Sequence, residues 1–409
     1  MSKLKVMYIV SVEAPPDVIG GLGRYIERMI AAWEDAPIRF VLFAMTLDPR
    51  VPKNNEVGSV TIHHMHGLRI KTKGIVAGTV IQIFNLALFN MNAICHILWA
   101  TRGRHDCAVA IHDWMACPSG ILCRLLTRMP VIFHIHSFEM HFHRNKFVAH
   151  SIQALEKYQC RLASAVIVPS YAMKTAVDSI VGFDLHVIVI PHGWNDPTLV
   201  QVLGEPPEHK QANSMLIRHQ FSVKGDEKLL VYAGRFAPHK GVIILLRAIA
   251  ILRRRIGRNI VTLLVGDGAS NTTDTDNIKN EISRLHLENW VYSDVGFLPS
   301  QDLYHYFLSA DVCVFPSTYE PFGLVATEAM ALGKPVVVGV GYSPDVIGNG
   351  AIRCPSDSPQ SLADSIELCL LSQEFADALG ARASIWILHS STWKEVAEST
   401  LQVYNSALS

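Results

Sequence analysis

The sequence predicts a two-domain α/β protein in which each domain is built on a doubly wound parallel sheet. Short runs of Val, Ile and Leu alternate with stretches in which apolar residues recur every three or four positions, as in strands and amphipathic helices. Continuous apolar strands between helices are typical of parallel sheets covered on both faces. The alternation restarts after a polar stretch, and 409 residues exceed what one hydrophobic core usually holds, so we expect two domains.

The predicted elements alternate along the chain. A helix over 21–34 follows the first strand, and the strands expected in the first domain are 5–10, 39–45, 60–65, 107–113, 131–137, 165–170 and 186–193. A polar, proline-containing stretch, 204–214, is predicted to be a linker. The second domain is expected to contain strands over 228–235, 260–268, 290–296, 312–317 and 335–339, with helices over 241–256 and 300–310. The stretch 391–408 has the spacing of one amphipathic helix.

The composition restricts the class of protein. Hydrophobic residues make up 49% of the chain and charged residues 18%, which suits a well-packed α/β protein and excludes a disordered one. The formal net charge is zero, so the bulk composition indicates no nucleic-acid partner. The eight cysteines are scattered without a CxxC pair, and no signal peptide is recognisable. We therefore expect reduced thiols and a cytoplasmic location.

The segment 74–100 carries no Asp, Glu, Lys or Arg and is long enough to span a bilayer. Five polar residues interrupt it: Gln82, Asn85, Asn90, Asn92 and His96. Because polar groups are costly in hydrocarbon, we expect a packed helix of the first domain rather than a span. Lysines and arginines on both flanks leave a second interpretation open, in which the helix lies on the face of a membrane.

The stretch GGLGRYIER, 20–28, opens the helix that follows the first strand. Gly21 and Gly23 would let a phosphate approach the backbone, where the free amides of a helix start attract anions. The stretch lacks GxGxxG, so a simple tight turn before the helix is the alternative.

A second loop, in VYAGRFAPHKG, carries two cations at the end of a strand. Arg235 and Lys240 flank this loop, and a helix begins at Gly241. Together the two side chains would balance the two negative charges of a diphosphate. Either one alone would be an ordinary solvated surface charge.

Histidines gather at the ends of two predicted strands. His112 ends the strand in AIHDWMACPSG, and VIFHIHSFEMHFHRN places His136, Glu139 and Arg144 beyond the next strand. Histidine is a common metal ligand, but no HExxH motif and no cysteine pair complete a site, so we expect no metal. A histidine at a strand's carboxyl end would hydrogen-bond a substrate hydroxyl, or be an ordinary core residue.

The stretch YEPFGLVATEA, 319–329, places two acids around a predicted helix start. Gly323 and Leu324 offer backbone amides to an anion there. Glu320, in the loop, could accept hydrogen bonds from a sugar, and Glu328, in the second turn, from the vicinal hydroxyls of a ribose. The structural alternative is that both acids only favour the helix dipole, by roughly 0.3–1 kcal/mol each.

In these motifs the chain resembles the retaining glycosyltransferases of family 4, which have the GT-B fold. The motifs occur in family order across nearly the whole chain: GGLGRYI, HDW, VPSYAMK, IPHGWN, YAGRFAPHKG, LLVGDG, VGFLP, YEPFGLVATEA and STWKEVAESTLQVY. Glu320 and Glu328 match the family's E-x7-E pair. Where the family often has a Gly-Gly pair followed by Glu, this chain has GYSPDVIGNG.

The resemblance implies two Rossmann-like domains facing across a cleft. The acceptor domain would be 1–195, completed by a C-terminal helix, 391–409, that crosses back, and the donor domain would be 196–390. The residues implied to bind the donor diphosphate are Gly21, Gly23, Arg235, Lys240, Gly323 and Leu324. Glu328 would bind the ribose, while Glu320 and His112, the expected catalytic residues, would lie beside the donor sugar. The residues expected to face the acceptor are His136, Glu139 and Arg144.

The implied activity is transfer of a hexose-type sugar with retention of configuration, without a metal or other cofactor. The donor would be a UDP-sugar, with GDP-, ADP- and TDP-sugars as alternatives, and the acceptor a hydroxyl of a glycan, a lipid-linked sugar or a small natural product. A GT-B phosphorylase is the nearest alternative. A nicotinamide-dependent oxidoreductase would use GGLG as its dinucleotide turn, and a non-catalytic sugar-binding subunit would have no reason to retain all four charged motif residues.

Overall fold

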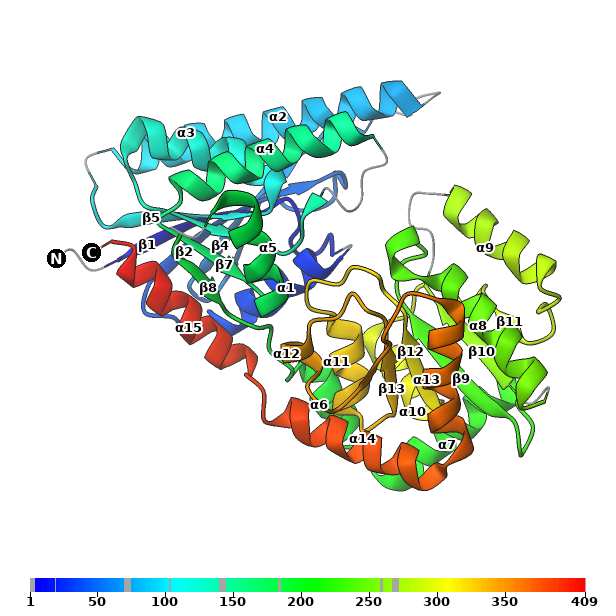
Figure 1. The fold of residues 1–409 in the computed structure, drawn as a ribbon. Helices are drawn as coiled ribbons and strands as arrows, with labels where there is room; N and C mark the ends of the chain where they lie inside the picture. Colours follow the sequence, from blue (N-terminus) through cyan, green and yellow to red (C-terminus); the bar gives the residue numbers. More distant parts are fainter. Residues whose placement is uncertain are drawn as a thin grey trace. The chain divides into compact units, whose positions relative to one another are not determined.

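The computed structural model of the chain describes residues 4–18, 20–69, 75–102, 104–139, 145–182, 185–257, 260–266 and 272–408. The chain forms two compact units (Figure 1). Unit 1 contains the residues up to His192 and those from Trp393 onward, and unit 2 runs from Gly193 to Thr392. Each unit is a mainly parallel sheet with helices packed on it, which confirms the predicted fold class.

Unit 1 is built on an eight-stranded sheet. Its strands are β1 (Val6–Val10), β2 (Arg39–Thr46), β3 (Asn54–Val57), β4 (Val60–His66), β5 (Cys107–His112), β6 (Val131–His134), β7 (Ala165–Val168) and β8 (Val187–Val189). Their order is β3-β4-β2-β1-β5-β6-β7-β8, and every neighbouring pair is parallel except β3 with β4. The central strands β1 and β5 are buried along their whole length, as strands covered on both faces must be.

The helices of unit 1 cover both faces of this sheet. They are α1 (Gly21–Ala32), α2 (Ile75–Ala100), the short η1 (Trp114–Ala116), α3 (Cys117–Thr127), α4 (Lys146–Leu162), α5 (Tyr171–Val181) and α15 (Trp393–Ser406). In Figure 1, α2, α3 and α4 form a layer on one face, while α1 and α15 lie on the other. Side-chain caps define two helix starts, since Asn145 accepts from amides of α4 and Ser170 from an amide of α5.

Unit 2 is built on a six-stranded sheet. Its strands are β9 (Lys228–Ala233), β10 (Ile260–Val265), β11 (Val291–Tyr292), β12 (Val312–Phe315), β13 (Val336–Val338) and β14 (Ile352–Arg353). The order is β11-β10-β9-β12-β13-β14, with all pairs parallel. Successive side chains of β9 enter different cores: Leu229 and Val231 pack on one face of the sheet, Leu230 and Tyr232 on the other.

Helices fill both faces of the second sheet. They are α6 (Pro197–Leu203), α7 (Pro207–Gln220), η3 (Pro238–Lys240), α8 (Val242–Arg255), α9 (Thr272–Arg284), α10 (Ser300–Ser309), α11 (Leu324–Ala331), α12 (Pro344–Ile347), α13 (Pro359–Leu371) and α14 (Gln373–Leu388). Buried residues of α10 and α11 belong to one core, and those of α8 and α13 to the other. The loops after β9 and β12, which carry predicted site residues, lie at the carboxyl ends of adjacent parallel strands.

The predicted linker at 204–214 is wrong, because most of it belongs to α7 inside unit 2. Pro207 occupies the first position of that helix, where a missing amide costs nothing. Within α7 only Ile217 is buried, so the helix lacks the apolar spacing by which sequence patterns are recognised. The short strands β3 and β14 were also not predicted, since one is polar and the other has two residues.

Candidate active site

His112, the predicted catalytic residue of unit 1, ends β5 and is fully buried. Its Nδ1 lies 3.0 Å from Nε2 of His136, so one imidazole donates a hydrogen bond to the other. Its ring stacks on that of His134, the last residue of β6, with centroids 4.3 Å apart. The stack follows from strand register, because His112 and His134 are partners in the parallel pairing of β5 with β6.

Aromatic side chains from distant elements close around these histidines. The ring of Tyr25, on α1, lies 4.6 Å from that of His136 and 5.0 Å from that of His192. Trp393, the first residue of α15, stacks on His192 at 5.9 Å. We call the whole set the histidine–aromatic cluster: His112, His134, His136, His192, Tyr25, Trp393 and Tyr404.

The C-terminal helix α15 contributes a direct hydrogen bond to the cluster. The hydroxyl of Tyr404 lies 2.8 Å from Nε2 of His134, and both side chains are buried. Residues 270 positions apart in the sequence are thereby joined at one point. The bond orients the imidazole that stacks beneath His112.

Burial keeps the histidines of the cluster neutral. It lowers the pKa of His112, His134 and His192 well below the usual value, and the pKa of His136 to about 3. For His112 the neighbouring imidazoles act in the same direction, because one charged ring would repel another. Among the described residues, Nε2 of His112 and Nδ1 of His136 are buried and have no hydrogen-bond partner. Each of these two nitrogens can donate one hydrogen bond to a bound hydroxyl or accept one from it.

Three of these imidazoles are close enough to raise the question of a metal. Ligand atoms of His112, His134 and His136 lie within 4.8 Å of one another. However, the three ring planes are within 18° of parallel, and His112 stacks face to face on His134. A nitrogen lone pair lies in its ring plane, so stacked rings direct their lone pairs past one another rather than at a shared ion. The absence of a metal requirement stays a prediction.

Asp113 organises the loop that carries His136. Its carboxylate accepts from the backbone amides of His136 (2.7 Å) and Ser137 (3.4 Å), and its own φ is 56°. Burial raises the pKa of this carboxyl to about 7, although the two hydrogen bonds from His136 and Ser137 act to lower it. Asp113 therefore positions His136, a role not predicted from the sequence.

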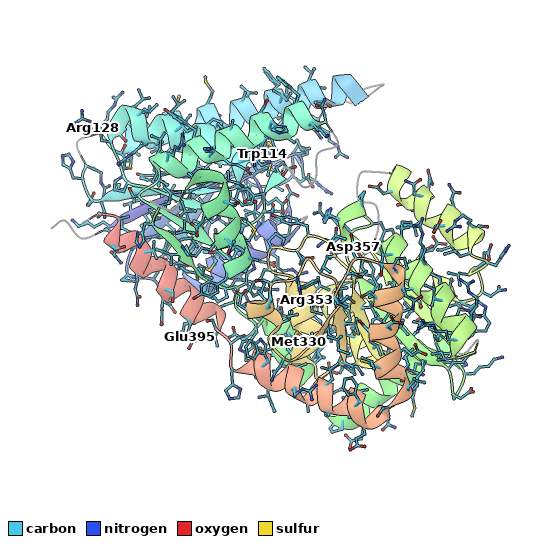
Figure 2. The ribbon with its side chains drawn as sticks, in the orientation of Figure 1. Trp114, Arg128, Met330, Arg353, Asp357 and Glu395 are labelled. Atoms are coloured by element: carbon cyan, nitrogen blue, oxygen red, sulfur yellow. The ribbon has the colours of Figure 1, made fainter. Side chains whose placement is uncertain are left out.

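Of the two other residues expected to face an acceptor, the structure describes Glu139. The carboxylate of Glu139 accepts a hydrogen bond of 3.1 Å from the indole nitrogen of Trp114, on η1, whose side chain is labelled in Figure 2. This contact joins Glu139 to the segment that follows His112. Arg144 lies outside the described residues.

The glycine turn at the start of α1 already holds a carboxylate. Oε2 of Glu13 accepts from the amides of Gly20 and Gly23, each at 3.0 Å. A Cβ at Gly23 would lie only 2.7 Å from that oxygen, which accounts for glycine at this position. Gly21, the other predicted phosphate-binding glycine, has open space where a Cβ would stand. The turn is thus an anion site that the chain's own Glu13 fills, and the sequence reading missed Glu13.

In unit 2 the structure brings Lys240 and Glu320 together. Nζ of Lys240, on η3, lies 2.6 Å from Oε2 of Glu320, and Ser317 donates to the same oxygen at 3.0 Å. Both charged side chains are largely buried. Arg235 is exposed, and its backbone oxygen accepts from the buried hydroxyl of Tyr232. The hydrogen bond from Tyr232 therefore anchors the backbone of the loop after β9, while the side chain of Arg235 is exposed to solvent.

The start of α11 is an uncapped helix N-terminus. Gly323 occupies the cap position before Leu324 with φ 93°, and as a glycine it has no side chain that could accept from the first amides. Its φ favours glycine, and a Cβ would also clash with the ring of Tyr342. Tyr342 belongs to the stretch that departs from the family pattern, and it is buried beside Gly323. We call Arg235, Lys240, Ser317, Glu320 and the start of α11 the unit 2 site.

Glu328 lies one turn into the same helix and is 8% exposed. Of the predicted pair of acids, Glu320 lies in the loop and contacts Lys240, and Glu328 lies in the helix. Signals for the missed residues are weak: Tyr342 lies in GYSPDVIGNG, where the chain differs from the family pattern, and Tyr25, Trp393 and Tyr404 look like ordinary core aromatics in the sequence. Contacts with histidines in the folded structure distinguish Tyr25, Trp393 and Tyr404 from other core aromatics.

Comparison with known proteins gives matches over most of the chain. The family described as "Glycosyltransferase Family 4" matches residues 19–196, and "Glycosyl transferases group 1" matches residues 214–386. An uncharacterized glycosyltransferase, MJ1607, of Methanocaldococcus jannaschii is 28% identical over 73% of this chain and 74% of its own length.

Solved structures share the fold. Sucrose-phosphate synthase from Thermosynechococcus elongatus superposes with a TM-score of 0.80 at 23% identity, covering 98% of both chains. Anabaena Alr3699/HepE, in complex with UDP-glucose, superposes with a TM-score of 0.71 at 19% identity, covering 98% of this chain and 99% of that one. With these two parallel-sheet units and both family matches, the chain belongs to the GT-B glycosyltransferases of the family 4 type.

Proposed function

We propose that this glycosyltransferase moves a hexose-type sugar from a nucleotide-diphosphate sugar to a hydroxyl acceptor with retention of configuration. The observation that carries the proposal is the unit 2 site, where Lys240, Arg235 and an uncapped helix start occur at the ends of adjacent strands. Two cations and free helix amides match a diphosphate, which carries two negative charges.

The donor we favour is a UDP-sugar. The complex of HepE with UDP-glucose supports this choice through the shared fold, and GDP-, ADP- and TDP-sugars are the alternatives. Glu328 would accept hydrogen bonds from the ribose, and Glu320 would lie beside the donor sugar. His112 would lie beside the donor sugar as well. On the acceptor side we place the neutral imidazole of His136, because a neutral ring can hydrogen-bond a hydroxyl without attracting a second anion.

In the proposed reaction, the bond between the anomeric carbon and the diphosphate oxygen breaks as the acceptor oxygen bonds to the same face of that carbon. The acceptor proton passes to the departing diphosphate oxygen, so no carboxylate has to act as a nucleophile. The chief task of the protein is then to stabilise charge on the leaving diphosphate. Lys240 can do so once its contact with Glu320 is exchanged for the phosphate. No metal or other cofactor takes part.

A donor-hydrolysis screen tests the proposal without knowledge of the acceptor. The purified chain is incubated with UDP-, GDP-, ADP- and TDP-sugars, and free nucleoside diphosphate is measured. We expect one nucleotide to be released, with the sugar initially in the anomeric configuration of the donor by NMR. Release of inverted sugar would contradict the retaining mechanism, and no release from any donor would contradict the donor class.

The alternative activities give different products in the same assays. A phosphorylase would release sugar 1-phosphate when inorganic phosphate is the acceptor, and would need no nucleotide. A nicotinamide-dependent oxidoreductase would bind NADH and change its fluorescence on titration. Neither result is expected.

A further inference from the structure

Helix α2 has two apolar faces, and only one of them packs on unit 1. Asn85, Phe89, Ala93 and Ile97 recur every four residues and are buried against the rest of the unit. The opposite stripe is exposed to solvent, with Val80 60%, Phe84 48%, Leu88 43%, Met91 63% and Trp99 69% exposed. A solvent-facing stripe of this kind is normally polar. Only 33% of the most apolar stretch of this helix is buried, whereas the packed helix predicted from the sequence would be mostly buried.

Polar contacts on the inner face hold α2 to the protein. The side chain of Asn85 accepts from the amide of Leu68 at 2.8 Å and donates to its carbonyl at 3.0 Å. Asn90 donates to the carbonyl of Met115 at 2.9 Å and accepts from Ser119 at 2.7 Å. To cross a bilayer, the helix would have to break these bonds and leave two amides unpaired in hydrocarbon. The helix is therefore attached along its length, with one apolar side turned outward.

The neighbouring helices extend the apolar surface. On α3, Leu125 and Leu126 are 56% and 63% exposed, and on α4 Phe147 is 80% exposed. Figure 1 shows α2, α3 and α4 side by side in one layer. Large exposed apolar side chains gathered on three adjacent helices are unusual on a protein that stays free in solution.

The charges on this layer have one sign. The sequences of α2, α3 and α4 contain a single acid, Glu156, and it is 1% exposed. Exposed cations stand at the ends of these helices: Arg102, Arg128, Lys146 and Arg161. Figure 2 shows Arg128 at the outer end of α3. An apolar face bordered by cations and lacking exposed acids is complementary to anionic lipid, which attracts nearby Lys and Arg side chains. In a symmetric dimer the same face would set cation against cation.

We infer that the outer face of α2, α3 and α4 binds the surface of a membrane containing anionic lipid, with the apolar stripe of α2 inserted at the level of the headgroups. The helix lies in the plane of the interface and does not span. This inference is independent of the donor chemistry proposed for unit 2.

Co-sedimentation with vesicles tests it on the full chain. Vesicles of phosphatidylcholine alone are compared with vesicles containing 30% phosphatidylglycerol, at low and at high salt. We expect binding to the anionic vesicles, reduced by salt but not abolished, because the apolar contribution is not screened. The double variant Phe84→Gln/Leu88→Gln should weaken binding by at least about tenfold, because it removes two apolar side chains that the membrane would bury. Arg128→Glu/Lys146→Glu should weaken it most at low salt.

A matched control and a second readout keep the outcomes distinct. Leu371→Gln removes an apolar side chain that is even more exposed, at 69%, from α13 of unit 2 and should leave binding unchanged. Donor hydrolysis in solution and the melting temperature should be the same for all these variants. Absence of binding by the parent chain, or equal binding by the α2 double variant and the parent, would overturn the inference. So would a dimer on size-exclusion chromatography that Phe84→Gln/Leu88→Gln converts to monomer, because the face would then bind a second copy.

Discussion

In unit 1 the candidate functional side chains are imidazoles and aromatic rings whose charge is suppressed by burial, whereas in unit 2 they are ions and backbone amides at the ends of strands. One glutamate from each unit shows the same contrast. Burial, assisted by Asp113, raises the pKa of Glu156 in unit 1 to about 8. In unit 2, hydrogen bonds from Arg284 and Arg247 lower the pKa of Glu281 to about 2.

This difference matches the two substrates of the proposed reaction. A diphosphate needs positive charge and amide donors, which unit 2 presents in Lys240, Arg235 and the start of α11. A neutral hydroxyl acceptor needs hydrogen-bonding groups that do not compete for the diphosphate. Substitutions in the two units should therefore change different measured quantities.

The largest effect is expected from removing a cation of unit 2. Lys240→Ala or Arg235→Ala should reduce transition-state stabilisation by roughly 2–4 kcal/mol, because each side chain would lose a contact that strengthens as the diphosphate departs. The measurement is kcat/KM for donor hydrolysis, with melting temperature as a check on folding. Lys279→Ala, which removes a half-exposed lysine on α9, is the matched control. Near-normal turnover by both variants would remove the diphosphate assignment.

The next effect concerns the buried acid of unit 1. Both carboxyl oxygens of Glu156 are buried. Its folded pKa is raised above the unfolded value of 4.5, so its contribution to stability is fully present below pH 4.5 and is lost as pH rises through about 8. Glu156→Gln should therefore increase the free energy of unfolding at pH 9 by roughly 3 kcal/mol, and much less at pH 4.5.

Denaturant unfolding at the two pH values measures this change, and the opposite sign in unit 2 is the control. The pKa of Glu281 is depressed, so its contribution is present above pH 4.5 and is lost as pH falls toward 2. Glu281→Gln should therefore destabilise the chain at neutral pH. A Glu156→Gln variant that is equally stabilised or destabilised at both pH values would show that this carboxyl is not held neutral.

The two acids of the E-x7-E pair should respond differently from each other. Glu328→Gln removes a contact to the ribose held before and during the reaction, so it should raise KM for the donor by about thirtyfold, or about 2 kcal/mol. Glu320→Gln acts beside the reacting carbon and should lower kcat more than it raises KM. Equal, small kinetic effects together with a clear drop in melting temperature for both variants would support a purely structural role.

The smallest effect is expected at the hydrogen bond between α15 and β6. Tyr404→Phe leaves Nε2 of His134 buried without a partner, which should cost about 1–2 kcal/mol of stability. Tyr158→Phe, at a half-exposed position on α4, is the matched control and should cost nothing measurable. If both variants unfold at the same denaturant concentration as the parent, the bond does not contribute to stability.

Much of the fold could be predicted because the relevant information is local. All twelve strands expected from apolar runs are present, since a run of Val, Ile and Leu specifies a strand buried on both faces without reference to the rest of the chain. Strand β3 and helix α7, which were not predicted, are polar and mostly exposed. They therefore lack the apolar spacing by which a buried face is recognised in the sequence. Helix α2 shows the limit clearly: apolar residues on both faces predict burial, but periodicity does not say which face is covered.

Neighbouring residues specify strands, loops and helix starts, so the alternating α/β architecture, the charged loop residues of unit 2 and the spacing of Glu320 and Glu328 can be read from local patterns. Which side chains meet depends on the tertiary structure. The register of β5 with β6 stacks His112 on His134, and α15 brings Tyr404 to the same point. Glu13 fills the glycine turn, and Lys240 bonds Glu320 across 80 residues. These contacts depend on how distant segments pack, and no local pattern records that packing.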